Sequence, residues 1–161
     1  MKPWLIFQVV SFQAVWLLCV LGGNPYLPLV AAVLLVHFVC TPTRGADVKI
    51  AACATAGVIV DMLLWALGIF DFAGWPFWLV PLWMAFALNI GHSLRFLKTI
   101  HPAWVALLGA LGGAYSYLVA WKLEAVGLPH GAIISGLAVA VCWGCILPGL
   151  VKLDGFFRQP H

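Results

Sequence analysis

The chain has 161 residues, of which 65% are hydrophobic and 8% are charged, and its formal net charge is +3. A soluble globular domain carries about 25% charged residues and about 45–50% apolar ones, so this chain has too few charges to cover a water-facing surface. A lipid bilayer accommodates such a composition. The small net charge comes from Lys and Arg in loops, and it indicates membrane topology rather than nucleic-acid binding.

Six apolar segments joined by short connections predict an all-α bundle of six transmembrane helices, a single integral membrane domain over residues 1–161. A span needs about 20 residues, within a range of about 17–25. The predicted spans are Trp4–Leu21, Tyr26–Cys40, Ile50–Ile69, Phe77–Leu94, Ala103–Trp121 and Ala132–Val151. The first follows a Lys, as in a secretory signal, but lacks a small-residue cleavage site, so we expect a retained span.

Seven of the eight basic residues fall in every second gap between the predicted spans. They are Lys2, Arg44, Lys49, Arg95, Lys98, Lys152 and Arg158. Only Lys122 falls in an alternate gap. Lys and Arg remain on the cytoplasmic side of spanning helices. The distribution therefore predicts that both termini are cytoplasmic.

Asp61 lies near the middle of the third predicted span, where an ionised carboxylate is costly unless it is paired or hydrated. Cys53 and Gly57 lie on the same helical face, and small residues mark the side along which a neighbouring helix approaches. We therefore expect Asp61 to point into the bundle. The carboxyl is a candidate proton or cation site, or a polar group in a cavity. The alternative is a structural carboxyl that hydrogen-bonds a neighbouring helix.

Asn89 and His92 stand at i and i+3 on the fourth predicted span, followed by Ser93. At about 1.5 Å of rise per residue, Asn89 differs in depth from Asp61 by roughly one helical turn. A hydrogen bond between them is expected if the third and fourth spans pack together, whereas His92 reaches Asp61 only through water. The site that we favour comprises Asp61, Asn89 and His92 and opens to the cytoplasm. The alternative for His92 is an interfacial histidine that bonds a carbonyl or a lipid headgroup.

Gln8 and Tyr117 complete the set of polar candidates. Gln8 shares a face of the first span with Ser11, and amides in such positions more often link helices than contact ligands. Tyr117 lies off the small-residue face of the fifth span, where it could line a cavity. The candidates for binding or proton relay are Asp61, Asn89, His92, Ser93, Gln8 and Tyr117.

Small residues form one stripe on each of the last two predicted spans. The stripes are Gly109 and Gly113 on the fifth span, and Gly136, Ala140 and Gly144 on the sixth. Such stripes let helix backbones approach closely in membranes. We expect the fifth and sixth spans to pack together, with a homodimer seam as the alternative.

Other chemistry-bearing motifs are absent or unsuitably placed. Cys142 and Cys145 form a CxxC sequence, but redox CxxC motifs act at a helix N-terminus of a soluble fold, whereas this pair lies inside a span. The histidines form no HxxxH or HExxH pattern. No Ser-His-Asp set, phosphate-binding loop or dinucleotide motif is present either. We therefore expect no metal and no cofactor.

The fourth span contains the run Pro81-Leu-Trp-Met-Ala-Phe-Ala-Leu-Asn89-Ile-Gly-His92-Ser93-Leu. It resembles the signature of an uncharacterised family of small bacterial inner-membrane proteins, a domain of unknown function, in which Leu-Trp-x-x-Phe is followed by Asn and then His-Ser-Leu. A weaker similarity begins at Asp61-Met-Leu-Leu, and the resemblance extends over nearly the whole chain. It implies a six-span protein of the bacterial inner membrane, and it implies no activity.

Three functions fit these features. The one that we favour is a small transporter or binder of a small solute or lipid, because a compact bundle holds an intramembrane acid near other polar groups. A lipid-modifying enzyme with His92 as base and Asp61 as partner is the second, although no second carboxylate, nucleophile or metal set accompanies them. The third is a non-catalytic subunit of a larger membrane complex. The expected partners are membrane lipids, with a possible second copy or a larger membrane protein.

Overall fold

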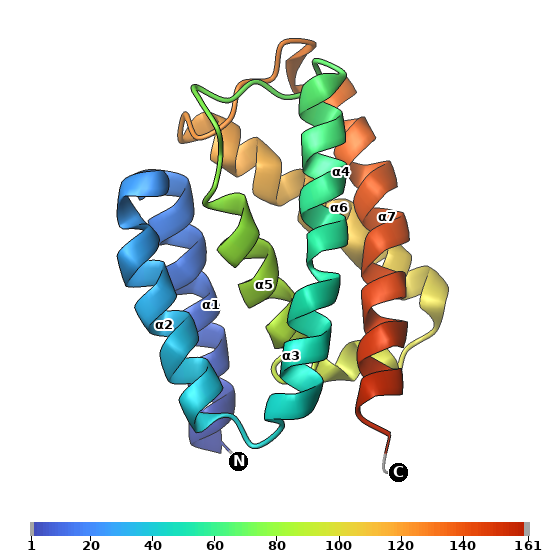
Figure 1. The fold of residues 1–161 in the computed structure, drawn as a ribbon. Helices are drawn as coiled ribbons and strands as arrows, with labels where there is room; N and C mark the ends of the chain where they lie inside the picture. The colour runs from blue at the N-terminus through green and yellow to red at the C-terminus, as the bar shows by residue number, and fades with distance from the viewer. Residues whose placement is uncertain (1, 160–161) are drawn as a thin grey trace.

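The computed structural model describes residues 2–159, and every regular element in this range is a helix (Figure 1). The elements are α1 (Lys2–Gly22), the 3₁₀ helix η1 (Asn24–Tyr26), α2 (Leu27–Cys40), α3 (Arg44–Cys53), α4 (Thr55–Ala66), α5 (Leu79–Ile90), the 3₁₀ helix η2 (Arg95–Lys98), α6 (Pro102–Lys122) and α7 (Gly131–Phe157). An isolated antiparallel bridge joins Asp71 to Gly127. The predicted all-α class is confirmed for this part of the chain.

The helices surround α5, which lies in the middle of the bundle (Figure 1). The α1–α2 hairpin stands on one side, α3 and α4 follow one another along the front, α7 lies on the other side, and α6 crosses behind. The start of α1 and the end of α7 lie at the same end of the bundle. We call this end the terminal end, because the polar groups described below gather there.

The third predicted span is a helical segment that breaks once, at Ala54. The amide of Ala54 is shared between the carbonyls of Ile50 and Ala51, at 3.2 Å from each. The Thr55 hydroxyl donates to the Ala52 carbonyl at 2.7 Å, a bond that competes with the helical ladder. The helical segment begins at residue 44 rather than 50, so Asp47 lies on a helix and not in the loop where the hydropathy pattern places it.

Helix α5 is shorter than the fourth predicted span, and it ends at Ile90. The amides of His92 and Leu94 both donate to the carbonyl of Asn89, at 3.1 and 2.8 Å, which closes the helix with a tight turn. The prediction that Asn89 and His92 both lie on the fourth helix is therefore wrong for His92. His92 and Ser93 lie in the turn beyond the helix, where His92 points toward different neighbours from those of Asn89.

Helices α6 and α7 pack closely through the small residues that the sequence singled out. A Cβ atom placed on Gly109 would lie 2.6 Å from the Trp143 carbonyl oxygen, and one on Gly113 would lie 2.2 Å from the Trp143 ring. A Cβ atom placed on Gly144 would lie 3.5 Å from the Ala106 carbonyl oxygen of α6. The expected packing of the fifth and sixth spans is confirmed.

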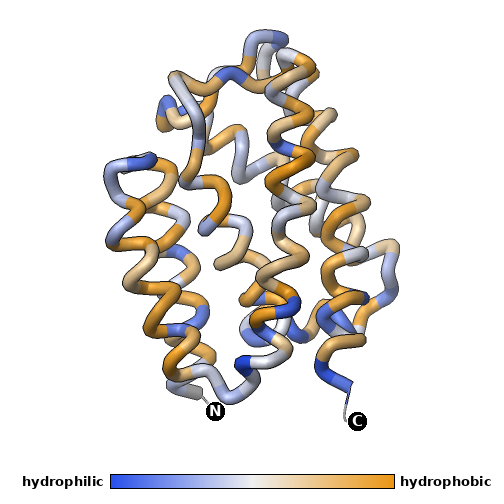
Figure 2. Tube along the Cα trace, in the orientation of Figure 1, coloured by the Kyte–Doolittle hydropathy of each residue, from blue (hydrophilic) through white to orange (hydrophobic). Residues whose placement is uncertain are grey.

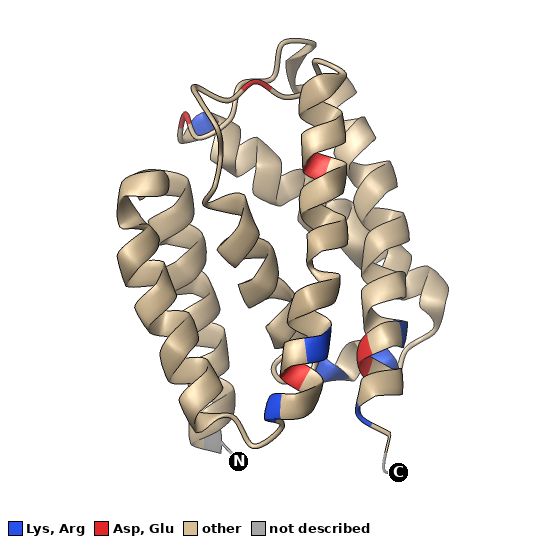
Figure 3. Ribbon diagram, in the orientation of Figure 1, with Lys and Arg blue, Asp and Glu red and all other residues tan. Residues whose placement is uncertain are grey.

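Hydrophobic residues cover the helices along most of their length, as Figure 2 shows. Four helical segments in the described range are long and apolar enough to cross a membrane, namely Pro3–Gly22, Arg44–Ala66, Pro102–Lys122 and Gly131–Phe157. The segments Asn24–Cys40 and Leu79–Ile90 are apolar but shorter. Most Lys and Arg residues gather at the terminal end (Figure 3). This composition identifies a membrane protein.

Candidate functional site

Asp47 is the centre of a buried polar network at the terminal end, and its side chain is 0% exposed. Nη2 of Arg158 donates to Oδ1 of Asp47 at 2.5 Å. Nε2 of His37 lies 3.3 Å from Oδ2, and Nε2 of His92 lies 3.2 Å from both carboxylate oxygens. The Thr41 hydroxyl also donates to Oδ2. Four segments distant in sequence therefore meet at one carboxylate.

Each of these side chains is placed by the end of a helix. His37 lies in the last turn of α2, Asp47 in the first turn of α3, and Arg158 caps the end of α7. The guanidinium of Arg158 lies against Gly91, where an added Cβ atom would come within 1.9 Å of Nη2. The glycine that ends α5 is thus required for the Arg158–Asp47 contact.

A second ion-pair group shares Arg158 with the first. Nε of Arg158 lies 2.9 Å from Oδ1 of Asp154, one turn earlier on α7, and Lys98 of η2 contacts the same carboxylate. Asp154 is also completely buried. The two carboxylates are thus balanced by two cations, which is the condition under which buried charges are tolerated.

The hydrogen-bond partners of His92 determine where its proton lies. The indole N–H of Trp4 donates to Nδ1 of His92 at 3.1 Å, and an indole nitrogen can only donate. In the neutral imidazole, the proton therefore lies on Nε2, facing Asp47. The side-chain amide of Gln8 lies 2.9 Å from Nδ1 of His37 and orients that ring in the same way.

His37, Asp47 and His92 have the composition of a metal site, and their candidate ligand atoms lie within 4.8 Å of one another. A metal ion needs the lone pair of Nε2. The proton of His92 would then have to move to Nδ1, where it would face the donor of Trp4. An ion would also lie beside the guanidinium of Arg158 in a group whose charges already balance. We therefore interpret the cluster as a closed hydrogen-bonded network that joins the helix ends.

Asp61 lies in a separate group, in the other half of the α3–α4 segment. Its side chain is 1% exposed, so the expectation that Asp61 points into the bundle is confirmed. The indole N–H of Trp83 donates to Oδ2 at 2.6 Å, and the hydroxyl of Tyr117 donates to the same oxygen at 2.5 Å. Asp61 thus links α4 to α5 and α6 through two neutral donors.

The rings around Asp61 are packed against glycines. Trp83 lies flat on Gly57, where an added Cβ atom would come within 2.3 Å of the indole. On its other side Trp83 stacks on Trp143 of α7, with ring centroids 4.6 Å apart and planes inclined by 23°. Trp143 in turn covers Gly113. The result is a rigid layer across four helices, from α4 through α5 and α7 to α6.

An apolar groove of about 520 Å³ lies behind this layer, between α1 and α6. Phe12, Gln13 and Trp16 of α1 form one wall. The other wall runs along α6 from residue 108 to residue 119, a length of roughly 16 Å at about 1.5 Å per residue. Trp16 and Ser116 join the two walls, with an indole-to-hydroxyl hydrogen bond of 2.9 Å.

A buried polar atom in the wall of the groove has no partner. Trp143 lines the groove together with Phe86 of α5, and its indole nitrogen is the buried side-chain atom in the described residues that lacks a hydrogen-bond partner. Leaving a buried N–H unpaired costs about 1–3 kcal/mol.

A family model matches residues 5–149 and describes a protein of unknown function, DUF2878. The chain belongs to the DUF2878 family. The matched range contains Asp47, His92, Asp61 and both walls of the groove, whereas Arg158 lies beyond it. The comparisons with curated proteins and with solved structures found no match.

The structure separates the residues that sequence reasoning placed in one DUF2878 site. The expected hydrogen bond between Asp61 and Asn89 is not made in the described residues. Asn89 donates to the Ala85 carbonyl of its own helix at 2.9 Å and accepts from the Ser93 hydroxyl at 2.5 Å. A similar depth in the bundle does not bring Asn89 to Asp61, because Trp83 and the layer of rings already fill the space beside Asp61.

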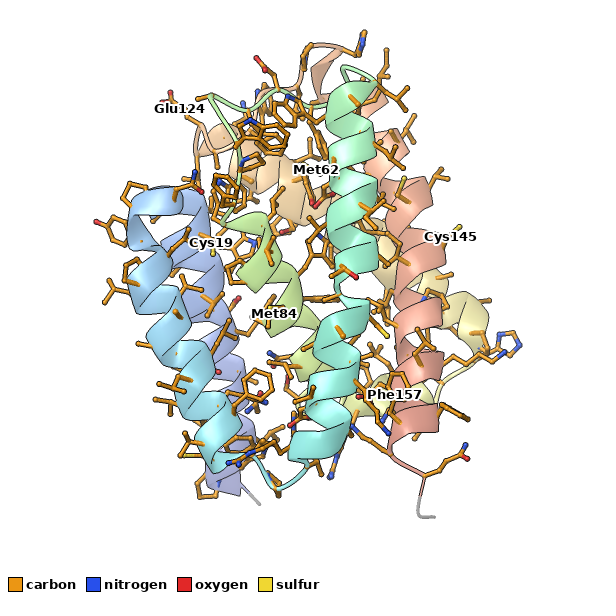
Figure 4. All side chains as sticks on the ribbon, viewed as in Figure 1. Cys19, Met62, Met84, Glu124, Cys145 and Phe157 are labelled. Carbon is orange, nitrogen blue, oxygen red and sulfur yellow. The ribbon has the colours of Figure 1, made fainter. Side chains whose placement is uncertain are left out.

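The remaining candidates are divided between the two buried groups. Gln8 links α1 to His37 of α2, as an interhelical amide should, and Tyr117 contacts Asp61 rather than an open cavity. The CxxC cysteines are free, with Cys142 half-buried and Cys145 pointing outward from α7 (Figure 4).

Sequence reasoning missed His37, Asp47 and Arg158, the core of the terminal network. Asp47 is 10 residues from His37 and 111 residues from Arg158, and neither separation is a spacing that a helical pattern reveals. The one feature of the sequence that could have indicated Asp47 is the scarcity of acidic residues. Asp47 is one of only five acidic residues in the chain, and it stands beside a predicted span.

Proposed function

We propose that this protein binds a lipid in the groove between α1 and α6, with a hydrocarbon chain along α6. The observation that supports this best is the groove itself, which has mostly apolar walls and runs along α6 for several turns. The hydrocarbon chain of a membrane lipid complements such walls. The volume is within the range of about 300–1,000 Å³ for small-molecule sites.

The buried carboxylates favour binding over ion-coupled transport or catalysis. Asp47 and Asp61 each have internal donors, and both are almost completely removed from solvent. His92 is buried and faces Asp47 with the nitrogen that a catalytic base would need. Neither group is open to a substrate in this arrangement, so a structural role fits their contacts better.

We also propose that the chain crosses the membrane six times with both termini in the cytoplasm. Four helices have the length for a crossing, and the two shorter apolar helices would complete the remaining two. Helix α5, with 12 residues, can cross only because protein surrounds it and its irregular flanks. The resemblance noted above supports the bacterial inner membrane as its location.

The binding proposal is tested by blocking the groove at Gly112. A Cβ atom at Gly112 has no neighbour within 4 Å, and the position lines the groove, so Gly112→Leu fills the groove without a clash at Cβ. Gly149→Leu is the matched control, because Gly149 is also helical and open but does not line the groove.

The purified full-length protein is exposed to a phosphatidylcholine that carries a photoreactive group on its acyl chain, and the labelled residues are mapped by mass spectrometry. We expect labelling of the groove walls in the wild type and Gly149→Leu, and its loss in Gly112→Leu. Uniform labelling of all outward faces in every variant would contradict the proposal. A stoichiometric protein that co-purifies and covers the groove would also contradict it, and would favour a role as a subunit.

A further inference from the structure

The groove ends, toward the terminal end of the bundle, at the segment that carries Arg95. Leu94, Phe96 and Leu97 line the groove, and Arg95 lies between them with an exposed side chain. A cationic group is therefore attached to the segment that closes one end of an apolar groove.

Four other cations at this end are already engaged. Lys98 and Arg158 form ion pairs with buried carboxylates, Arg44 donates to backbone carbonyls, and the Lys49 ammonium lies 5.9 Å from the centroid of the Phe157 ring. Among the described side chains, Arg95 makes no hydrogen bond or ion pair with another residue. Arg95 does not itself line the groove, but its exposed side chain is free to pair with an anionic group at the edge of the groove.

We propose that the groove selects a phospholipid of net negative charge, with an acyl chain along α6 and its phosphate at Arg95. This inference rests on the proposed function. The guanidinium fork matches phosphate geometry. In phosphatidylcholine the choline cation offsets the charge of the phosphate, whereas in an anionic phospholipid that charge is uncompensated, so Arg95 favours the anionic lipid. Arg95 belongs to the same short helix as Lys98, whose ion pair with Asp154 holds this helix at the terminal end, where headgroups would lie if the helices cross a bilayer. The site would then recognise both the hydrocarbon chain and the charge of the headgroup.

The experiment is competition against the photoreactive phosphatidylcholine. The competitors are unlabelled phosphatidylglycerol and phosphatidylcholine with the same acyl chains, together with a free fatty acid. For the wild type, we expect phosphatidylglycerol to compete about fivefold more effectively than phosphatidylcholine, as one basic residue near the headgroup provides. Arg95→Gln should remove this difference and retain labelling by the probe. Lys152→Gln is the matched control, because Lys152 is also exposed and without a partner in the described residues but lies on α7, away from the groove lining.

Three outcomes would overturn the inference while leaving lipid binding intact. They are equal competition by the two phospholipids in the wild type, an unchanged preference in Arg95→Gln, and an equal loss in Lys152→Gln. Stronger competition by the fatty acid than by phosphatidylglycerol would also overturn it, because the carboxylate would then be the recognised group. If the probe does not label the groove at all, the proposed function itself fails.

Discussion

Asp47 and Asp61, two of the buried carboxylates, are satisfied by different chemistry. Asp47 is paired with a guanidinium and hydrogen-bonded by imidazoles and a hydroxyl. Asp61 receives only an indole and a phenol, both uncharged donors. The identities of the partners therefore determine what a substitution at each position should do.

Asp61→Asn should retain most of the stability, whereas Asp61→Leu should not. Asn presents an oxygen of the same shape to Trp83 and Tyr117. Leu leaves both donors unpaired at about 1–3 kcal/mol each. Thermal unfolding of the purified protein in detergent measures the difference. Equal melting temperatures for the two variants would contradict this account, and a large loss in Asp61→Asn would show that the negative charge itself is needed.

The terminal network should be insensitive to zinc and to chelators. The Trp4 donor on His92 and the Arg158 guanidinium on Asp47 leave no free ligand atoms for an ion. An ion that binds the native state at a hundredfold excess over its Kd would stabilise the protein by about 2.7 kcal/mol. The melting temperature should therefore not change when zinc or EDTA is added. A zinc-dependent rise that disappears in His37→Ala would show that the cluster is a metal site.

At the scale of elements, two adjacent glycines of α6 have opposite roles. Gly113 lies under the Trp143 ring, whereas Gly112 faces open space in the groove. The first permits helix packing, and the second leaves the groove free. The small-residue stripe predicted from the sequence contains Gly113 and not Gly112. It does not show that Gly112 faces a groove, because that depends on where the neighbouring helices cross.

Gly113→Ala should destabilise the protein by about 1–3 kcal/mol, as overpacking of a tight contact does. Gly112→Ala should leave stability unchanged or raise it slightly, because alanine favours the helix by up to about 1 kcal/mol over glycine. Melting temperatures of the two variants provide the comparison. If Gly112→Ala were the more harmful, the assignment of the two faces would be reversed.

Helix positions were predictable from the sequence, and helix ends were less so. Each of the six apolar segments coincides with a helix, because burial in lipid or protein requires apolar runs. The starts and ends differ where polar groups belong to helices. Asp47 lies inside the helix that begins at Arg44, and the segment expected to reach Leu94 ends at Ile90. A hydropathy pattern places the end of a helix at the first charged residue. The helical backbone continues past that residue when its side chain has a partner.

At the scale of the whole molecule, the basic residues and the buried network occupy the same end of the bundle (Figure 3). The bias toward one side follows from the asymmetry of membrane insertion. The ion pairs there also require a particular tertiary arrangement, because they form only when the ends of six separate elements meet. The terminal end is thus both the expected cytoplasmic face and the place where the helices are joined.

Reporter insertions test the proposed crossings, including that of the short helix α5. Alkaline phosphatase, which is active only outside the cytoplasm, is inserted after Gly74, after Thr99 or after Glu124 in full-length protein produced in a bacterium. We expect activity after Gly74 and Glu124 and none after Thr99. Activity at Thr99 would mean that α5 does not cross, and would reduce the number of crossings.

The sequence by itself determined the all-helical class, the positions of the helices and the burial of Asp61, because each depends on apolar composition or on one helical period. The tertiary structure alone decided which polar side chains contact one another. It separated Asp61 from His92, joined His37, Asp47 and Arg158, and opened a groove beside Gly112. These outcomes depend on how helices cross and where they end, and such long-range geometry leaves no spacing in the chain that a local pattern can detect.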